Sequence, residues 1–124
     1  MKRIMLGLVL VLLLSSVSYA DSIKFQWDRN LESDMGHYTL YQCNTGVCTT
    51  KTAVGLDIPH PSVGQYVTYT YAFTPPPGTE EVRYYTVSAT DQIGNESGIS
   101  NVVNTRVDNK PPAIPGSLII VLIN

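Results

Sequence analysis

The chain of 124 residues is poor in charge and in cysteine, and these shortages exclude several classes of protein. Lys and Arg together number 8 against 10 Asp and Glu, so the formal net charge is −2. Eight scattered cations are too few for a basic face that follows a nucleic-acid backbone, so we expect no nucleic-acid partner. The length holds one domain and excludes a large two-domain enzyme.

The chain also lacks an apolar run long enough to span a bilayer. Its N-terminal run, Ile4 to Leu14, is well short of the roughly 20 residues that a membrane helix needs. Lys2 and Arg3 precede this run, and the small residues Ser18 and Ala20 follow it at the positions that signal peptidase reads. The pattern predicts a signal peptide over residues 1–20, with export to the periplasm or the extracellular space and no membrane span after cleavage. An uncleaved N-terminal anchor is the alternative.

The two cysteines, Cys43 and Cys48, would then enter an oxidising compartment where a disulfide persists. The residues between them have turn chemistry and the flanking residues are β-branched or alternate in polarity. This predicts a hairpin whose last cross-strand pair is Cys43 and Cys48. Opposed residues lie about 4.5–5.5 Å apart, which a disulfide accepts, and closing so short a loop stabilises by about 2 kcal/mol. A metal or redox site is disfavoured, because no histidine pair has ligand spacing and the motif is not Cys-x-x-Cys.

No helical period of useful length follows residue 20. Short alternating runs separated by turn signals predict an all-β fold, an antiparallel β-sandwich. The alternation places one set of side chains inside the sandwich. This predicted core consists of Trp27, Tyr38, Leu40, Tyr71, Tyr85, Val87 and Ala89. The final strand is expected over residues 99–107.

Two segments resemble the fibronectin type III family. The run YYTVSATDQIGNESGISNVV, residues 84–103, is similar to the last two strands of that family and their connecting loop. The run FQWDRNLESDMGHYTLY, residues 25–41, is similar to its second and third strands, with Trp27 and Tyr38 as the core aromatics. The resemblance implies an immunoglobulin-like sandwich over residues 21–107.

The sequence departs from the family pattern in two places. The family's tyrosine corner would fall on Arg83 by counting alternate residues back from Ala89, or on Tyr85 if a bulge intervenes. A complete domain also has a strand before the one that bears the tryptophan, and only residues 21–26 precede Trp27. The first strand is therefore expected to be missing.

The C-terminal tail is a candidate replacement. Residues 108–117 form a proline-rich linker, and residues 118–124 an apolar orphan strand. In the family, such a stretch opens the next domain. Exposed, it would be an aggregation segment. We expect it to pair with the exposed edge of the strand bearing Trp27, in cis or from another copy. This strand-addition edge is formed by Ile23, Phe25, Leu118 and Ile120, and it implies self-association.

No catalytic, metal or cofactor site is expected. The two histidines, His37 and His60, come with no nucleophile elbow or oxyanion loop, which leaves a hidden hydrolase as the weakest hypothesis. The acidic residues of the loop after Trp27 do not match a calcium-loop spacing and are expected to be solvated. The sequon Asn95-Glu96-Ser97 also fits a turn, which is the favoured interpretation.

These expectations indicate a secreted, non-catalytic interaction or spacer module whose partner is a protein or a polysaccharide. One alternative is a carbohydrate-binding accessory module, for which Tyr41, Tyr66 and Tyr84 are candidate outer-face aromatics. The other is a subunit of a surface assembly joined by strand exchange.

Overall fold

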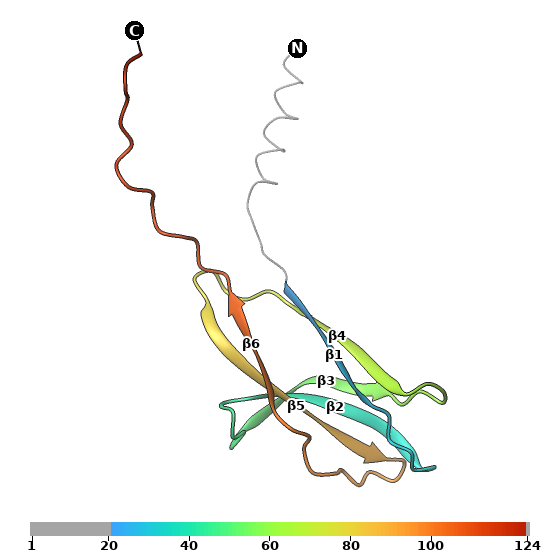
Figure 1. Ribbon diagram of the computed structural model, residues 1–124. Coiled ribbons are helices and arrows are strands. Elements are labelled where there is room, and N and C mark those ends of the chain that lie inside the picture. Colours follow the sequence, from blue (N-terminus) through green and yellow to red (C-terminus); the bar gives the residue numbers. More distant parts are fainter. Residues whose placement is uncertain (1–20, 124) are drawn as a thin grey trace, which may run out of the picture.

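The computed structural model describes residues 21–123, and this part of the chain is all-β, with six strands and no helix (Figure 1). The predicted signal peptide lies outside the described residues. The strands are β1 (Asp21–Asp28), β2 (Met35–Cys43), β3 (Lys51–Pro59), β4 (Tyr66–Phe73), β5 (Glu80–Asp91) and β6 (Val103–Asp108).

The strands form two antiparallel sheets that face each other as a sandwich (Figure 1). One sheet pairs β1 with β4, and the other has the order β3-β2-β5-β6. β1 has one face toward the other sheet and one toward solvent, as its alternating sequence predicts. The side chains of Ile23, Phe25 and Trp27 are half-buried, and the residues between them are exposed. A period of two places alternate side chains on opposite faces of a sheet.

The core lies between the sheets. Its buried cluster is Met35, Tyr38, Leu40, Ile58, Val67 and Tyr85. The other predicted core residues, Trp27, Tyr71, Val87 and Ala89, are half-buried and pack against this cluster. Aromatic rings meet edge to face across the interior, with centroids 5.4 Å apart for Trp27 and Tyr38 and 5.0 Å apart for Phe25 and Tyr85.

The hairpin register differs from the prediction. Cys43 pairs with Lys51, not with Cys48, because β3 begins only at Lys51. Cys48 lies in the turn, with a left-handed backbone at φ 59°. The turn is therefore longer than the four residues between the cysteines, and the disulfide links the end of a strand to its turn.

The last strand is shorter than predicted. It covers Val103–Asp108, not residues 99–107. Residues 97 and 100 still bond to β5, but serine hydroxyl groups replace some of the backbone acceptors, so the ladder is irregular there. The alternation of apolar residues does not show that serine hydroxyl groups accept hydrogen bonds in place of backbone carbonyl groups.

The sandwich is closed along one side only. β3 and β4 come into contact, and the Tyr69 ring lies directly over Gly55, where an added Cβ would be 3.0 Å from it. On the opposite side, no Cα atom of β1 lies within 8 Å of one in β6. The core is therefore less covered at the side of the sandwich formed by β1 and β6 than at the side formed by β3 and β4.

The C-terminal tail is extended and exposed. Residues 109–123 have no regular secondary structure, and they lead away from both sheets (Figure 1). The tail is not paired with β1 of its own chain. The apolar side chains from Leu118 to Ile123 are 71–96% exposed.

Candidate functional site

The free edge of β1 is the first element of the candidate site. β1 pairs with β4 over its whole length, from Asp21 opposite Phe73 to Asp28 opposite Tyr66. On its other side, no strand within residues 21–123 pairs with it. Backbone N–H and C=O groups along this side are therefore available for a further strand.

A shallow, largely apolar groove runs beside this edge. Phe25 and Trp27 of β1 form one wall, and Tyr85 and Val87 of β5 lie across the sandwich from them. Leu40 from β2 also lines the groove, so the hydrophobic core reaches its floor. The remaining lining residues are Gln26, Thr86, Ser100, Asn101 and Val103.

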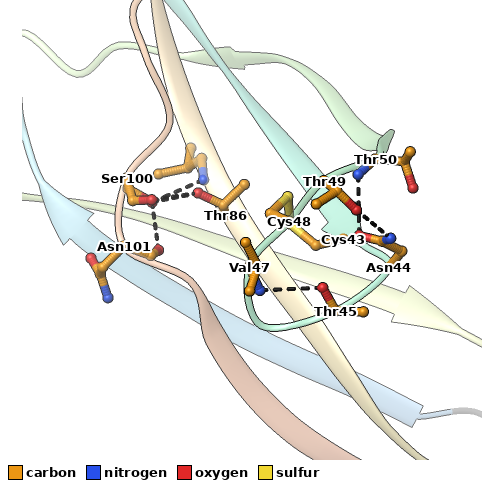
Figure 2. Close-up of a disulfide and its surroundings, with 11 residues drawn as sticks. Cys43, Asn44, Thr45, Val47, Cys48, Thr49, Thr50, Thr86, Ser100 and Asn101 are labelled. Carbon is orange, nitrogen blue, oxygen red and sulfur yellow. Dashed lines mark hydrogen bonds between the residues drawn. A yellow bond between two sulfur atoms is a disulfide. The ribbon is translucent and has the colours of Figure 1, made fainter.

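The far wall of the groove is the segment between β5 and β6, and two serines hold it in place. Ser100 donates its N–H to the Val87 carbonyl at 2.9 Å, and its hydroxyl accepts the Val87 N–H at 3.1 Å. Ser97 makes the same pair of bonds with Ala89, at 2.8 and 2.9 Å. The Thr86 hydroxyl donates to the Ser100 carbonyl at 2.9 Å (Figure 2). Sequence reasoning missed this wall; the spacing Ser97-x-x-Ser100 was its only signal.

Two buried polar atoms beside the groove lack partners. Neither the indole Nε1 of Trp27 nor the phenol Oη of Tyr85 has a hydrogen-bond partner among the described residues. Burial raises the pKa of the Tyr85 hydroxyl. The Tyr85 hydroxyl therefore makes no corner hydrogen bond, and the guanidinium of Arg83, the other candidate for the corner, pairs with Glu81 at 2.7 Å.

A polar cluster occupies the outer face of the four-stranded sheet. The Ser88 hydroxyl donates to the Glu96 carboxylate at 2.6 Å, and the Tyr41 hydroxyl donates to the same oxygen. These two donors lower the pKa of Glu96, and the carboxylate in turn raises the pKa of Tyr41. Lys51 lies 5.0 Å from the centre of the Tyr41 ring. The cluster explains why Ser88 is buried although it lies on the outer face of the sheet.

The disulfide between Cys43 and Cys48 is formed, with Cα atoms 4.8 Å apart (Figure 2). Hydrogen bonds within the turn support it. Asn44 donates its N–H to the Thr50 carbonyl at 3.0 Å, and its side-chain oxygen accepts the Thr50 N–H at 3.1 Å. Cys48 donates to the Thr45 carbonyl at 3.0 Å. The disulfide thus lies within an ordered turn.

The candidate histidines are separate and make structural contacts. His60 Nδ1 lies 3.0 Å from the buried Tyr38 hydroxyl, which also accepts the Asn30 N–H at 2.9 Å. His37 lies 3.8 Å from Asp57, on the strand pair β2–β3.

The chain turns directly after β5, just before the sequon residue Asn95. Gly94 has the left-handed conformation, at φ 96°, and not Asn95 of the sequon. The Asn95 side chain instead donates to the Asp91 carboxylate at 2.9 Å. The backbone N–H of Asn95 donates to the other oxygen of the same carboxylate at 2.8 Å. These contacts lower the pKa of Asp91.

The three outer-face tyrosines do not form one surface. Tyr41 and Tyr84 are half-buried on the outer face of the four-stranded sheet, whereas Tyr66 is exposed on β4 of the other sheet. The stacked aromatic pair that the structure does contain is Tyr71 and Phe73, with centroids 5.1 Å apart. Tyr71 packs against the core and Arg83 lies over Phe73, so this pair is not a free platform.

Of the predicted strand-addition residues, the structure places only half at the edge. Ile23 and Phe25 lie on β1, and Phe25 lines the groove. Leu118 and Ile120 lie in the exposed tail, away from the edge of their own chain.

Comparisons with models of protein families, with curated proteins and with solved structures found no match. No helix in the described part of the chain is long and apolar enough to cross a membrane.

The geometry of the site suits the binding of an extended segment. An unpaired strand edge beside an apolar groove can accept such a segment through backbone hydrogen bonds and alternate apolar side chains.

Proposed function

We propose that this chain is an exported, non-catalytic, fibronectin type III-like module that acts as an interaction or spacer domain. The observation that carries the proposal is the strand order of the two sheets.

The seven strands of an immunoglobulin-like sandwich are named A to G along the chain; B pairs with E, and C, F and G are neighbours in that order. If β1 corresponds to B, then β2 corresponds to C, β4 to E, β5 to F and β6 to G. The observed pair β1-β4 and the observed order β2-β5-β6 then match this pattern. Trp27 and Tyr38 then occupy the inner faces where the sequence resemblance put them. Three features depart from this pattern. The corner hydrogen bond is missing, and no strand within residues 21–123 pairs with the other side of β1. In addition, β3 lies beside β2, whereas the fourth strand of the constant-type immunoglobulin order lies beside the fifth.

Export is supported by the disulfide. Disulfides persist in oxidising compartments and are rare in reducing ones, and the bond between Cys43 and Cys48 lies in a turn with no catalytic sequence pattern. Together with the charged, apolar and small-residue pattern of residues 1–20, it favours a secreted or periplasmic protein.

A binding role is favoured over an enzymatic one by the contacts of the candidate polar groups. The imidazole of His60 is engaged by Tyr38, and the carboxylate of Glu96 by Ser88 and Tyr41. The Ser88 and Tyr38 hydroxyls that these groups contact are buried, so a substrate has no open path to them. The groove at β1 combines a largely apolar lining with an unpaired strand edge, and this combination suits a polypeptide strand.

Intact-mass measurement tests the first half of the proposal. We expect protein recovered from the exported fraction to begin near Asp21 and to weigh two hydrogens less than the reduced chain. Protein that keeps residues 1–20 and stays with the membrane fraction would support the anchor alternative and contradict this half.

A glycan array on the exported protein separates the proposal from the carbohydrate-binding alternative. On the outer face of the four-stranded sheet, the Tyr41 hydroxyl is bonded to Glu96 and the Tyr84 hydroxyl is not, so Tyr84→Ala is the relevant variant for that face. Specific glycan binding that Tyr84→Ala abolishes and Tyr66→Ala preserves would replace the proposed role by an accessory carbohydrate module.

A further inference from the structure

We propose that the groove at the free edge of β1 binds the apolar tail, residues 118–123, of a second copy of this chain by β-strand addition. The proposal goes beyond the role as an interaction module by naming the partner. It is independent of any external ligand, so a strictly monomeric chain would overturn it and leave that role untouched.

The acceptor is the one side of the sandwich where the core is both open and apolar. On the opposite side, Tyr69 of β4 covers Gly55 of β3, and the two sheets meet there. Along β1, the half-buried Phe25 and Trp27 face the groove, and the edge has no strand beside it within the described residues. A strand added here would supply both backbone partners and apolar cover.

The donor has the composition and length that this edge needs. Residues 118–123 are six consecutive apolar residues, each at least 71% exposed in the isolated chain. As an extended strand they would cover about 20 Å, which is about three-quarters of the length of the eight-residue β1. Exposed apolar segments of this kind aggregate unless they are paired or covered.

The chain's own linker directs the tail away from its own edge. β6 ends beside the start of β1, where Asp21, Asp108 and Asn109 line a common hollow. Asn109 is fixed there: its N–H donates to the Thr79 carbonyl at 2.6 Å, and its side chain donates to the Pro75 carbonyl at 2.8 Å.

From this anchored point, an antiparallel return would need the linker to reverse and run the whole length of β1 first. The nine residues 109–117 reach about 30 Å when fully extended, so little slack would remain for the reversal. Pro111, Pro112 and Pro115 fix φ and favour an extended path, and the tail leads outward from the end of the sandwich (Figure 1). Donation to a second copy needs no reversal.

Disulfide trapping between two differently labelled chains tests the pairing. One chain carries Gln26→Cys, on the exposed face of β1, and the other carries a single cysteine placed in turn at each position from 118 to 123. The native cysteines are already joined, so the introduced thiols are the reactive ones. We expect mixed chains to form a covalent dimer at alternate tail positions, because side chains on one face of a strand repeat every two residues.

Thr68→Cys on β4 is the matched control. Thr68 lies opposite Gln26 in the same sheet and is equally exposed, but it is one strand further from the proposed edge. A tail paired with β1 would be about 10 Å from it, too far for a disulfide. If Thr68→Cys formed the covalent dimer as well as Gln26→Cys, or if all tail positions reacted equally, the contact would be unspecific. If Gln26→Cys formed no covalent dimer, the tail would not pair with the edge of β1. Each of these results overturns the proposal. Trapping only when both cysteines are on one chain would show insertion in cis and overturn it as well.

Sedimentation of the full chain over a wide concentration range gives the second readout. We expect the mass to rise with concentration, and Ile119→Asp/Ile120→Asp to weaken the association at least about tenfold, because one of two neighbouring side chains in a strand faces the apolar groove. Ala113→Asp/Ile114→Asp introduces the same two charges in the linker, where the Ile114 side chain is 92% exposed, and should leave the association unchanged. A wild-type chain that stays monomeric, or two variants that behave alike, would refute the proposal.

Discussion

Tyr38 and Tyr85 are both buried, yet only one of their hydroxyl groups has a partner. The Tyr38 hydroxyl accepts the Asn30 N–H and lies 3.0 Å from His60 Nδ1, whereas the Tyr85 hydroxyl is buried without a hydrogen bond. We expect Tyr85→Phe to be neutral or stabilising by up to about 1 kcal/mol, because it removes a desolvated hydroxyl and no bond. Tyr38→Phe should destabilise by about 1–2 kcal/mol, since it leaves the Asn30 N–H without its acceptor. Urea unfolding of the two variants measures the difference, and equal losses would contradict it.

Glu96 makes stability depend on pH in the acid range. Its pKa in the folded chain is lowered by donors from Ser88 and Tyr41, so it lies below the unfolded value. The contribution is therefore complete above the unfolded pKa and is lost as pH falls through the folded pKa. We expect Glu96→Gln to flatten the fall in melting temperature on the acid side. Glu32→Gln, in the exposed loop between β1 and β2, should retain the wild-type slope.

The hairpin between β2 and β3 is the element that the disulfide constrains. Its loop is local, with a sequence separation of 5, so its removal should cost only about 2 kcal/mol. We expect the double variant Cys43→Ser/Cys48→Ser to keep the fold and to unfold at lower denaturant. Thiol labelling of the unreduced wild-type chain should modify neither cysteine. Labelling of both, or a variant that does not fold, would contradict this account.

The start of β2 depends on a close approach that only glycine allows. An added Cβ at Gly36 would be 2.8 Å from the Asp91 carbonyl oxygen, where the register of β2 and β5 shifts. We expect Gly36→Ala to destabilise by about 1–3 kcal/mol, because backbone atoms must move. Gly98→Ala meets no atom within 4 Å and is the control. Thermal unfolding compares the two variants. Similar melting temperatures would show that the backbone of β5 can move away from position 36 without loss of stability.

At the same scale, the sequence predicted strands better than their ends and partners. Alternation in β1, β4 and β5 was enough to assign which side chains face inward, because a period of two is a local property. The register of Cys43 with Lys51 and the shortened β6 were not predictable in this way. Both depend on side chains, Asn44 in the turn and Ser100 beside β5, that replace backbone partners.

At the scale of the whole molecule, the sequence led to an expectation of an open edge but not of the groove. The expectation rested on the resemblance to a family with one more strand, and within residues 21–123 no strand pairs with the other side of β1. The groove is built from four separate stretches of chain, which meet only through tertiary packing: β1, β2, β5, and the start of β6 with the segment before it. No local pattern in the sequence says that Val103 lies near Trp27.

The end of the folded domain gives the last prediction, which compares two truncated chains. Asn109 bonds to Thr79 and Pro75, and Gly78 donates to the Asn109 carbonyl at 2.9 Å, so the domain extends two residues past Val107. A chain that ends at Val107 loses these bonds and should be about 1–3 kcal/mol less stable than one that ends at Lys110. The chain ending at Lys110 should match the full chain in unfolding midpoint at low concentration, because the removed apolar side chains are exposed and contribute nothing to the monomer. It should also be more soluble, since an aggregation-prone segment is gone. A lower midpoint for the chain ending at Lys110, measured at a concentration where both are monomeric, would show that the tail packs on its own sandwich.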